Sequence, residues 1–291
     1  MRNSSHTSLQ GEELSARDQS TLVDLPDFKF HMNHSPCNEQ RPPKLLVMVH
    51  SAPKNYEKRL QIRNTWGSVL EGTLIFVLGE VDNEALQSNL EQENRQFGDL
   101  VQGSFLDAYR NLTYKHTTTL KWVQYFCPYA HYILKTDDDT FINTPALLQV
   151  LSKEDCQLKN LIMCRLWVKV PVQRQGYKWT VSRTEFEPDV FPNYCSGTAI
   201  LYSSDVAHML YREAQKAPYF WVDDVHVTGV LAGKLNLSHF GVEGQILPVR
   251  LSYNETIICR NHPSHLSFLF SRHNMSAKAM TMLWHYVQKC S

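Results

Sequence analysis

Short apolar runs alternate with amphipathic stretches over the first half of the 291-residue chain. The apolar runs contain β-branched and aromatic residues, which is typical of strands buried on both faces. Strands are predicted at residues 44–51, 73–79, 100–105 and 132–135, and helices between them at residues 56–66, 83–97 and 113–126. This alternation predicts a parallel α/β sheet with right-handed crossovers.

The second half of the chain has a more mixed pattern. Strands are predicted at residues 161–167 and 198–202, and helices at residues 205–216, 222–235 and 276–288. The first 41 residues are instead rich in Ser, Asn, Gln and charge, and two prolines follow them. We therefore expect a flexible, stem-like segment over residues 1–41 and a folded domain over residues 42–291.

Composition narrows the classes of function. Hydrophobic residues make up 43% of the chain, which is enough for a sizeable core, and the formal net charge is zero, so no nucleic-acid partner is expected. No Gly-x-Gly-x-x-Gly pattern follows the first predicted strand, so the dinucleotide-binding fingerprint is absent. The polar start of the chain contains no apolar run that would predict a signal peptide or a membrane-spanning helix.

The seven cysteines and the glycosylation acceptors favour the lumen of the secretory pathway. No Cys-x-x-Cys pair is present, so a zinc ribbon is not predicted, and up to three disulfides of unknown connectivity are possible. Asn-x-Ser/Thr triplets begin at Asn3, Asn33, Asn111, Asn236, Asn254 and Asn274, of which the last four are the expected glycosylation sites. A cytosolic protein with chance triplets is the alternative.

Three consecutive aspartates, Asp137–Asp139, follow the fourth predicted strand. Ligands of open α/β sheets lie beyond the carboxyl ends of the strands. Asp137 and Asp139 would there be oxygen ligands for Mg²⁺ or Mn²⁺. A solvated acidic turn is the alternative, whereas the spacing required for an EF-hand loop is not present.

A second acidic pair, Asp223 and Asp224, opens a predicted helix directly after Trp221 and Val222. Capping of the helix N-terminus would explain one of the two acids. A carboxylate in a partly apolar cleft has a raised pKa, which suits a general base. Both interpretations are open from the residues alone.

Four basic or nucleophilic residues are weaker candidates. Arg59 and Arg63 are four residues apart, so they share a helix face and could hold a diphosphate, although a solvated basic face has the same pattern. His273 precedes the last helix and could be a metal ligand or an ordinary surface histidine. Ser196 lacks the Gly-x-Ser-x-Gly pattern of a nucleophile elbow, so a serine hydrolase is not predicted.

Five segments in order resemble the β1,3-glycosyltransferases of glycosyltransferase family 31, which include β1,3-galactosyltransferases and β1,3-N-acetylglucosaminyltransferases. The segments are Arg59–Gly67, Asp107–Lys115, Lys135–Asp139, Pro192–Thr198 and Asp223–Gly229. The resemblance covers about residues 44–288.

The resemblance implies a GT-A fold: an α/β structure with a Rossmann-like, mostly parallel central sheet flanked by helices. It places a nucleotide half at about residues 42–140 and an acceptor-binding half at about residues 141–291. It implies an inverting β1,3-hexosyltransferase that moves a sugar from a UDP-sugar to a hydroxyl of a glycan on glycoprotein or glycolipid. Galactose is the sugar that we expect. Transfer of N-acetylglucosamine or N-acetylgalactosamine is the alternative within the family. A metal-dependent phosphohydrolase and an inactive sugar-binding relative are more distant alternatives.

The resemblance also assigns roles to the acids. Asp137 and Asp139 match the Asp-x-Asp motif that holds Mn²⁺ (or Mg²⁺) against the diphosphate of the donor. Asp138 matches the middle acid, which would contact the ribose or the sugar. Asp224 matches the acid that is the proposed base. His273 matches the histidine of a His-x₆-Met-x₃-Trp ending, which would complete the metal site.

Other matches concern the UDP-sugar and the compartment. Arg59, Arg63 and Trp66 match the segment beside the nucleotide, and Lys135 belongs with the first two aspartates among the predicted donor-binding residues. Ala199–Ile200 stand where the family usually has Gly-Tyr, and Asp223 stands where the family more often has Glu.

The family implies a type II membrane protein of the Golgi, with an N-terminal anchor that is not found in this sequence.

Overall fold

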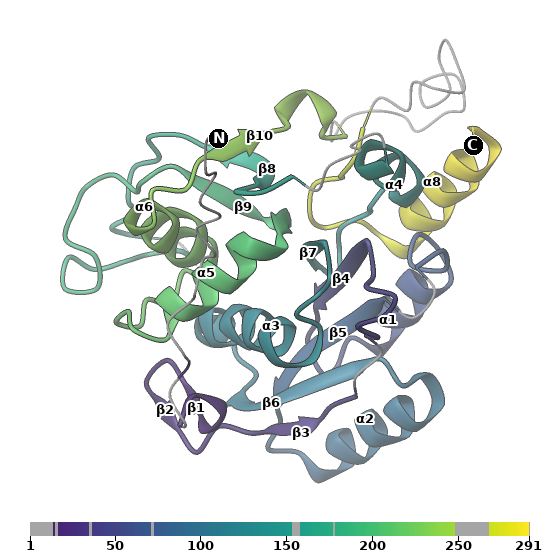
Figure 1. The fold of residues 1–291 in the computed structure, drawn as a ribbon, viewed down its shortest axis with the longest axis horizontal. Helices are drawn as coiled ribbons and strands as arrows, with labels where there is room; N and C mark the ends of the chain where they lie inside the picture. Colours follow the sequence, from purple (N-terminus) through teal and green to yellow (C-terminus); the bar gives the residue numbers. More distant parts are fainter. Residues whose placement is uncertain are drawn as a thin grey trace, which may run out of the picture.

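The computed structural model describes residues 14, 17–34, 37–70, 73–152, 158–176, 178–247 and 268–290. One large sheet dominates the structure (Figure 1). Its strands are β3 (Phe30–Met32), β4 (Leu45–His50), β5 (Leu74–Glu80), β6 (Leu100–Leu106), β7 (Tyr132–Asp137), β8 (Ile162–Trp167), β9 (Tyr194–Ser203) and β10 (His239–Gly241). Their order across the sheet is β10-β8-β9-β7-β4-β5-β6-β3.

The centre of the sheet is parallel. Strands β7, β4, β5 and β6 run in one direction, and all four coincide with strands predicted from the apolar runs. Strand β9 runs antiparallel to both β7 and β8, and β3 runs antiparallel to β6. The predicted α/β fold with a mostly parallel central sheet flanked by helices is confirmed, and the sheet is continuous through both halves of the chain.

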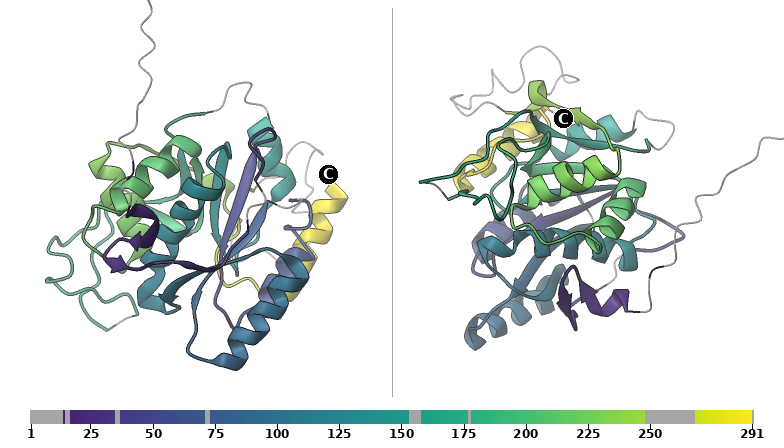
Figure 2. Two further views of the ribbon diagram at one scale, coloured as in Figure 1. Left: turned by 60° about the horizontal axis from the view of Figure 1, so that its bottom comes forward. Right: turned by 90° about the vertical axis from the view of Figure 1, so that its left-hand side faces the viewer.

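The helices cover both faces of this sheet. They are α1 (Tyr56–Arg63), α2 (Glu84–Phe97), α3 (Leu112–Phe126), α4 (Thr144–Ser152), α5 (Ser204–Ala214), α6 (Ala232–Lys234) and α8 (Ala277–Cys290). Apolar side chains of α1, α2, α4 and α8 pack on one face, and those of α3 and α5 pack on the other. Figure 2 shows the helices on either side of the sheet. Strand β4 supplies both cores, because Val47 and Val49 face one layer while Leu46 and Met48 face the other. This two-sided burial explains its continuous apolar sequence.

Helix α2 begins and ends where its sequence predicts. Asn83 accepts a hydrogen bond from the backbone N–H of Leu86 at 2.8 Å and so caps the first turn. Gly98 has a φ of 65°, a left-handed conformation that glycine adopts without strain and that stops the helix.

The segment before residue 42 differs from its prediction. Described residues of this segment form the short strands β1 (Thr21–Leu22) and β2 (Leu25–Pro26) as well as β3 of the main sheet. Leu22 and Phe28 are buried against Phe105, and a disulfide joins Cys37 to Cys127. The folded unit therefore begins earlier than residue 42, because a few apolar side chains in a polar stretch suffice to anchor it.

The predicted helix over residues 222–235 is present in a modified form. Asp223 and Asp224 open it, a π-helical stretch follows at Val225–Leu231, and α6 ends it. Wide turns of this kind are frequent at functional sites. Within the described residues no helix is both long and apolar enough to cross a membrane.

Candidate active site

A cavity of about 620 Å³ lies at the carboxyl end of β7. It is bounded by the end of β7, the first half of β9, the start of the π-helical segment and the residues before α8. Its lining includes Tyr109, Lys135, Asp137, Asp139, Arg165, Trp167, Lys178, Trp179, Tyr194, Ser196, Gly197, Thr198, Trp221, Asp223, Asp224, His273 and Asn274. The structure thus brings the two predicted acidic motifs together, although 84 residues or more separate them in sequence.

Asp137 is the last residue of β7, and it lines the cavity. The ammonium group of Lys135 donates to Asp137 Oδ1 at 2.8 Å and to the carbonyl oxygen of Gly197. Burial raises the pKa of Asp137 to about 6, and the nearby charges of Asp223 and Asp139 act in the same direction while Lys135 opposes them. Lys135 is therefore a fixed positive charge at the acidic end of the cavity.

Asp138 points elsewhere. Its carboxylate accepts hydrogen bonds from Ser51 Oγ at 2.8 Å, Asn55 Nδ2 at 2.8 Å and Lys58 Nζ at 2.9 Å, and the residue is 6% exposed. Ser51 and Asn55 lie between β4 and α1, and Lys58 lies in the first turn of α1, whereas Asp138 is not among the residues that line the cavity. In this structure the middle acid fixes the loop after β4 and does not face the cavity with Asp137 and Asp139.

Asp224 is held by two backbone donors. Its Oδ1 accepts from the N–H of Val225 at 2.8 Å and its Oδ2 from the N–H of Gly197 at 3.2 Å. Burial raises the pKa of Asp224 to about 7, and the adjacent charge of Asp223 adds to the rise. A carboxylate with this pKa can accept a proton near neutral pH.

Asp223 has a different environment, which sequence reasoning missed. His116 Nδ1 lies 3.0 Å from Asp223 Oδ2, and His116 Nε2 lies 3.1 Å from the Tyr202 hydroxyl. Burial would raise the pKa of Asp223, but the bond to His116 and the charge of Lys135 outweigh it and lower the pKa. The pKa values of the two adjacent acids are thus shifted in opposite directions. Asp223 is the group that stays ionised, and Asp224 is the group that can accept a proton. A histidine within a predicted helix gave no signal of this contact.

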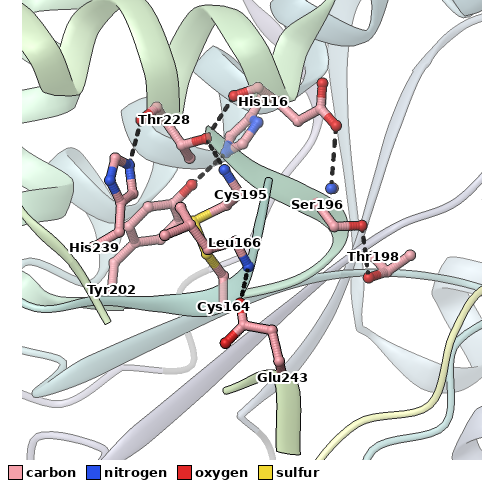
Figure 3. Close-up of a disulfide and its surroundings, with 12 residues drawn as sticks. His116, Cys164, Leu166, Cys195, Ser196, Thr198, Tyr202, Thr228, His239 and Glu243 are labelled. Atoms are coloured by element: carbon pink, nitrogen blue, oxygen red, sulfur yellow. Dashed lines mark hydrogen bonds between the residues drawn. A yellow bond between two sulfur atoms is a disulfide. The ribbon is translucent and has the colours of Figure 1, made fainter. Parts of the chain in front are cut away.

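A disulfide supports the same region (Figure 3). Cys164 of β8 is bonded to Cys195 of β9, and each cysteine directly precedes a residue of the cavity wall, Arg165 or Ser196. The N–H of Cys195 also donates to Thr228 Oγ1 at 2.9 Å, which ties β9 to the π-helical segment. These links fix the spacing between Gly197 and Asp224.

His273 reaches the cavity next to the aspartates. The backbone N–H of Met275 donates to the carbonyl oxygen of Asp139 at 2.9 Å, which brings the segment before α8 to the end of β7. Carboxylate oxygens with one imidazole suit Mn²⁺ and related divalent ions. Within the part of the chain that the structure describes, however, no three such groups converge closely enough to hold an ion. The donor chemistry fits a cation, and the geometry would have to tighten around it.

Arg59 and Arg63 are not at the cavity, which corrects the predicted diphosphate clamp. Arg59 is fully buried, and its guanidinium donates to both Glu93 oxygens, to Ser51 Oγ and to backbone carbonyls. Arg63 pairs with Glu93 and Asp99 at 2.7 Å. Arg59 and Arg63 do share a helix face, but that face is turned towards Glu93 of α2 and Asp99 after it. Neither a phosphate clamp nor a solvated basic face describes it.

Two further sequence expectations find a different setting. Trp66 is fully buried in the core, so the structure does not bring it to the cavity. Ala199 and Ile200 are buried on opposite faces of β9, opposite Thr136 and Lys135 of β7. The departure from Gly-Tyr therefore falls on the sheet core, while Ser196, Gly197 and Thr198 form the wall.

The glycosylation acceptors are differently placed. Asn236 and Asn274 are exposed, and Asn274 borders the cavity. Asn111 is half-buried and donates to the carbonyl oxygen of Leu106 at 2.8 Å. Asn254 lies outside the described residues.

Comparison with known proteins identifies the family. The family model for galactosyltransferases matches residues 57–243. Beta-1,3-galactosyltransferase 5 of Gorilla gorilla gorilla is 36% identical over 203 residues, covering 68% of each chain. Beta-1,3-galactosyltransferase 1 of Mus musculus is 30% identical over 223 residues, covering 75% of this chain and 68% of the relative.

The chain also resembles a solved structure distantly. A glycosyltransferase involved in glycosylation of the major capsid of PBCV-1 covers 84% of this chain and 98% of its own, with 10% identity and a TM-score of 0.37. A TM-score of this size carries no argument, so the assignment depends on the sequence matches. On those matches, the chain belongs to the galactosyltransferase family and is a glycosyltransferase.

Proposed function

We propose that this protein transfers galactose from UDP-galactose to a hydroxyl group of a glycan, forming a β1,3 linkage with inversion at the anomeric carbon. The observation that carries the proposal is one cavity that contains Asp224, with a pKa raised to about 7, together with Asp137 and Asp139. The sequence relatives named above are β1,3-galactosyltransferases, which favours galactose over an N-acetylhexosamine.

Asp224 is the proposed general base. Its carboxylate takes the proton of the attacking hydroxyl while the bond to the anomeric carbon forms. The N–H groups of Gly197 and Val225 orient the carboxylate, and only the ionised form can act. Since the pKa is about 7, the competent fraction falls as the pH falls through that value. Attack on one face with departure from the other inverts the anomeric carbon, as in inverting glycoside hydrolysis.

Asp137, Asp139 and His273 are the proposed ligands of a divalent cation, Mn²⁺ or Mg²⁺, because their oxygen and imidazole donors suit such ions. When bound, the ion supplies Lewis-acid stabilisation of the charge on the departing diphosphate. Lys135, held between Asp137 and Gly197, adds a second positive charge beside the leaving group.

The experiment that tests this function is a transfer assay with Asp224→Asn. The amide keeps the shape of the side chain but cannot accept the proton, so turnover should fall by about 10²–10⁴-fold while UDP binding, followed by calorimetry, persists. Asp82→Asn, at an exposed acid outside the cavity, is the matched control and should retain activity. Near-normal turnover of Asp224→Asn would overturn the assignment of the base.

The same assay tests the cation. Chelation should abolish transfer and added Mn²⁺ should restore it, and Asp139→Asn should weaken Mn²⁺ binding measured directly by titration. Full activity in excess chelator would remove the metal role of Asp137, Asp139 and His273. A screen of UDP-galactose against the two UDP-N-acetylhexosamines identifies the transferred sugar.

We also propose that the protein acts in the Golgi lumen as a type II membrane protein. The two disulfides and the exposed acceptors Asn236 and Asn274 support a secretory compartment. Expression in animal cells should give a product whose mass falls on treatment with an N-glycosidase. An unchanged mass would count against this location.

A further inference from the structure

Two of the six tryptophans are exposed on the wall of the active-site cavity. The other four are at most 7% exposed, whereas Trp167 is 37% exposed and Trp179 is 54% exposed. An exposed indole ring forgoes a large gain from burial. Exposed aromatic surface that gathers in a concave site is therefore a mark of ligand binding.

Two other aromatic rings of the wall each have a cation against them. Lys178 Nζ lies 3.9 Å from the centre of the Tyr109 ring, and the Arg110 guanidinium lies 4.3 Å from that of Trp221, which is 5% exposed. Arg165 stacks on Trp167 at 4.4 Å and leaves the opposite face of that ring uncovered by the cation. In the described part of the wall, Trp179 is the most exposed aromatic residue, and Trp167 and Tyr109 follow at 37% each, with Lys178 against the Tyr109 ring.

The loop that carries Trp179 is held in place by the protein. The Arg174 guanidinium donates to the carbonyl oxygens of Val181 at 3.1 Å and Phe186 at 2.8 Å, and the N–H of Val181 donates to the carbonyl oxygen of Gln173 at 2.9 Å. Val181 also packs in a small apolar cluster beneath the loop. A side chain fixed before the ligand arrives loses little entropy on binding.

Both tryptophans are linked to groups beside the proposed base. Trp179 lies close enough to the Tyr109 hydroxyl to lower the pKa of that group, but burial and then the charges of Asp223 and Asp224 outweigh this effect and raise the pKa to about 12. Trp167 pairs across β8 and β9 with Tyr194, whose pKa is raised by burial and by Asp224. The hydroxyl that receives the sugar must arrive at Asp224, so the tryptophans border the acceptor side of the reaction.

We infer that Trp167 and Trp179 recognise the glycan acceptor by stacking on the sugars that precede the accepting one. This inference rests on the proposed function and names the residues that would bind the acceptor at the same site. The C–H face of a pyranose ring can lie flat on an indole ring, where dispersion and weak C–H contacts hold it. The hydroxyl of the accepting sugar lies at Asp224, so we expect the exposed rings to contact the next sugars of the glycan.

The test compares two acceptors that share the same terminal sugar, a methyl monosaccharide and a trisaccharide. The wild type should use the trisaccharide with a kcat/KM about tenfold higher. Trp179→Ala and Trp167→Ala should each reduce this ratio towards one, mainly through a higher KM for the trisaccharide, and Trp179→Phe should retain most of it. The ratio is internal to each variant, so loss of folded enzyme does not change it.

Phe240→Ala is the matched control, because Phe240 is 59% exposed but does not line the cavity. It should keep the wild-type ratio. Titration of the wild type with the trisaccharide, followed by tryptophan fluorescence, should give a saturable change that is absent with the monosaccharide. A ratio near one in the wild type, an unchanged ratio in both tryptophan variants, or no fluorescence change would overturn the inference. Absence of any transfer by the wild type would instead contradict the proposed function, and the titration would still decide the inference.

Discussion

Glu93 is the residue that decides the role of the basic helix face of α1. It is 4% exposed and accepts hydrogen bonds from both Arg59 and Arg63. Burial alone would raise its pKa, but the hydrogen bonds and charges of the two arginines outweigh it and lower the pKa. The two guanidiniums thus pair with a buried carboxylate. Without this pairing, a charge would remain unpaired inside the protein, which is very costly.

Glu93→Gln tests this role. The change leaves Arg59 buried without its charge partner, so the free energy of unfolding should fall by about 3–5 kcal/mol, measured by urea denaturation. Glu91→Gln, on the exposed side of the same helix, should change it by less than about 0.5 kcal/mol. If Glu93→Gln is as stable as the wild type, Arg59 does not depend on this pair and a binding role returns.

At the scale of elements, the π-helical segment places the proposed base. Gly229 of this segment lies against the chain before β9. A Cβ atom at Gly229 would lie 2.9 Å from Pro192 Cγ and 3.2 Å from Tyr194 Cβ. The absence of a side chain therefore allows the close approach that holds Asp224 beside Gly197.

Gly229→Ala should separate these elements. The added methyl group has no space, so we expect a loss of about 1–3 kcal/mol in stability and a lower kcat, because Asp224 moves relative to Gly197. Gly233→Ala is the matched control: no atom lies within 4 Å of its Cβ position, and alanine favours the helix there. Equal thermal unfolding temperatures and rates for the two variants would contradict the packing argument.

At the scale of the whole molecule, the N-terminal segment closes over α3 and α5. Lys121 of α3 donates to the carbonyl oxygens of Asp18 and Thr21 and to the Tyr211 hydroxyl. The carboxylate of Asp18 accepts from the hydroxyls of Tyr125 and Tyr211. Three parts of the chain that are distant in sequence thus share one buried polar cluster.

Lys121→Met should release this segment. Loss of its hydrogen bonds should cost about 2–4 kcal/mol and expose residues 17–32 to limited proteolysis. Burial lowers the pKa of Lys121 from 10.5 to about 8, so the unfolded chain binds more protons between these values and the stability of the wild type should rise with pH across that window. The variant should lack this rise, and Lys159→Met, at an exposed lysine, should keep it. Unchanged proteolysis would show that the segment is held by other contacts.

The amino-acid sequence by itself determined the alternation of the central strands and helices. The burial of a strand can be predicted from its own residues, as in the apolar run of β4. The end of α2 can likewise be predicted from a glycine, Gly98. The order of the elements also determined that Asp137 and Asp139 would meet one end of the sheet. The pairing of these acids with Asp224 followed from the resemblance, and the cavity contains all three.

Only the tertiary structure decided the partners of individual side chains. Arg59 pairs with Glu93, 34 residues away, and His116 contacts Asp223, 107 residues away, while Asp138 turns from its neighbours towards Lys58. Periodicity records whether a position is buried, because burial repeats along an element. It does not record which distant group lies opposite, because that depends on how the elements pack. The same limit applies to the pairing of Cys164 with Cys195, which the sequence left open.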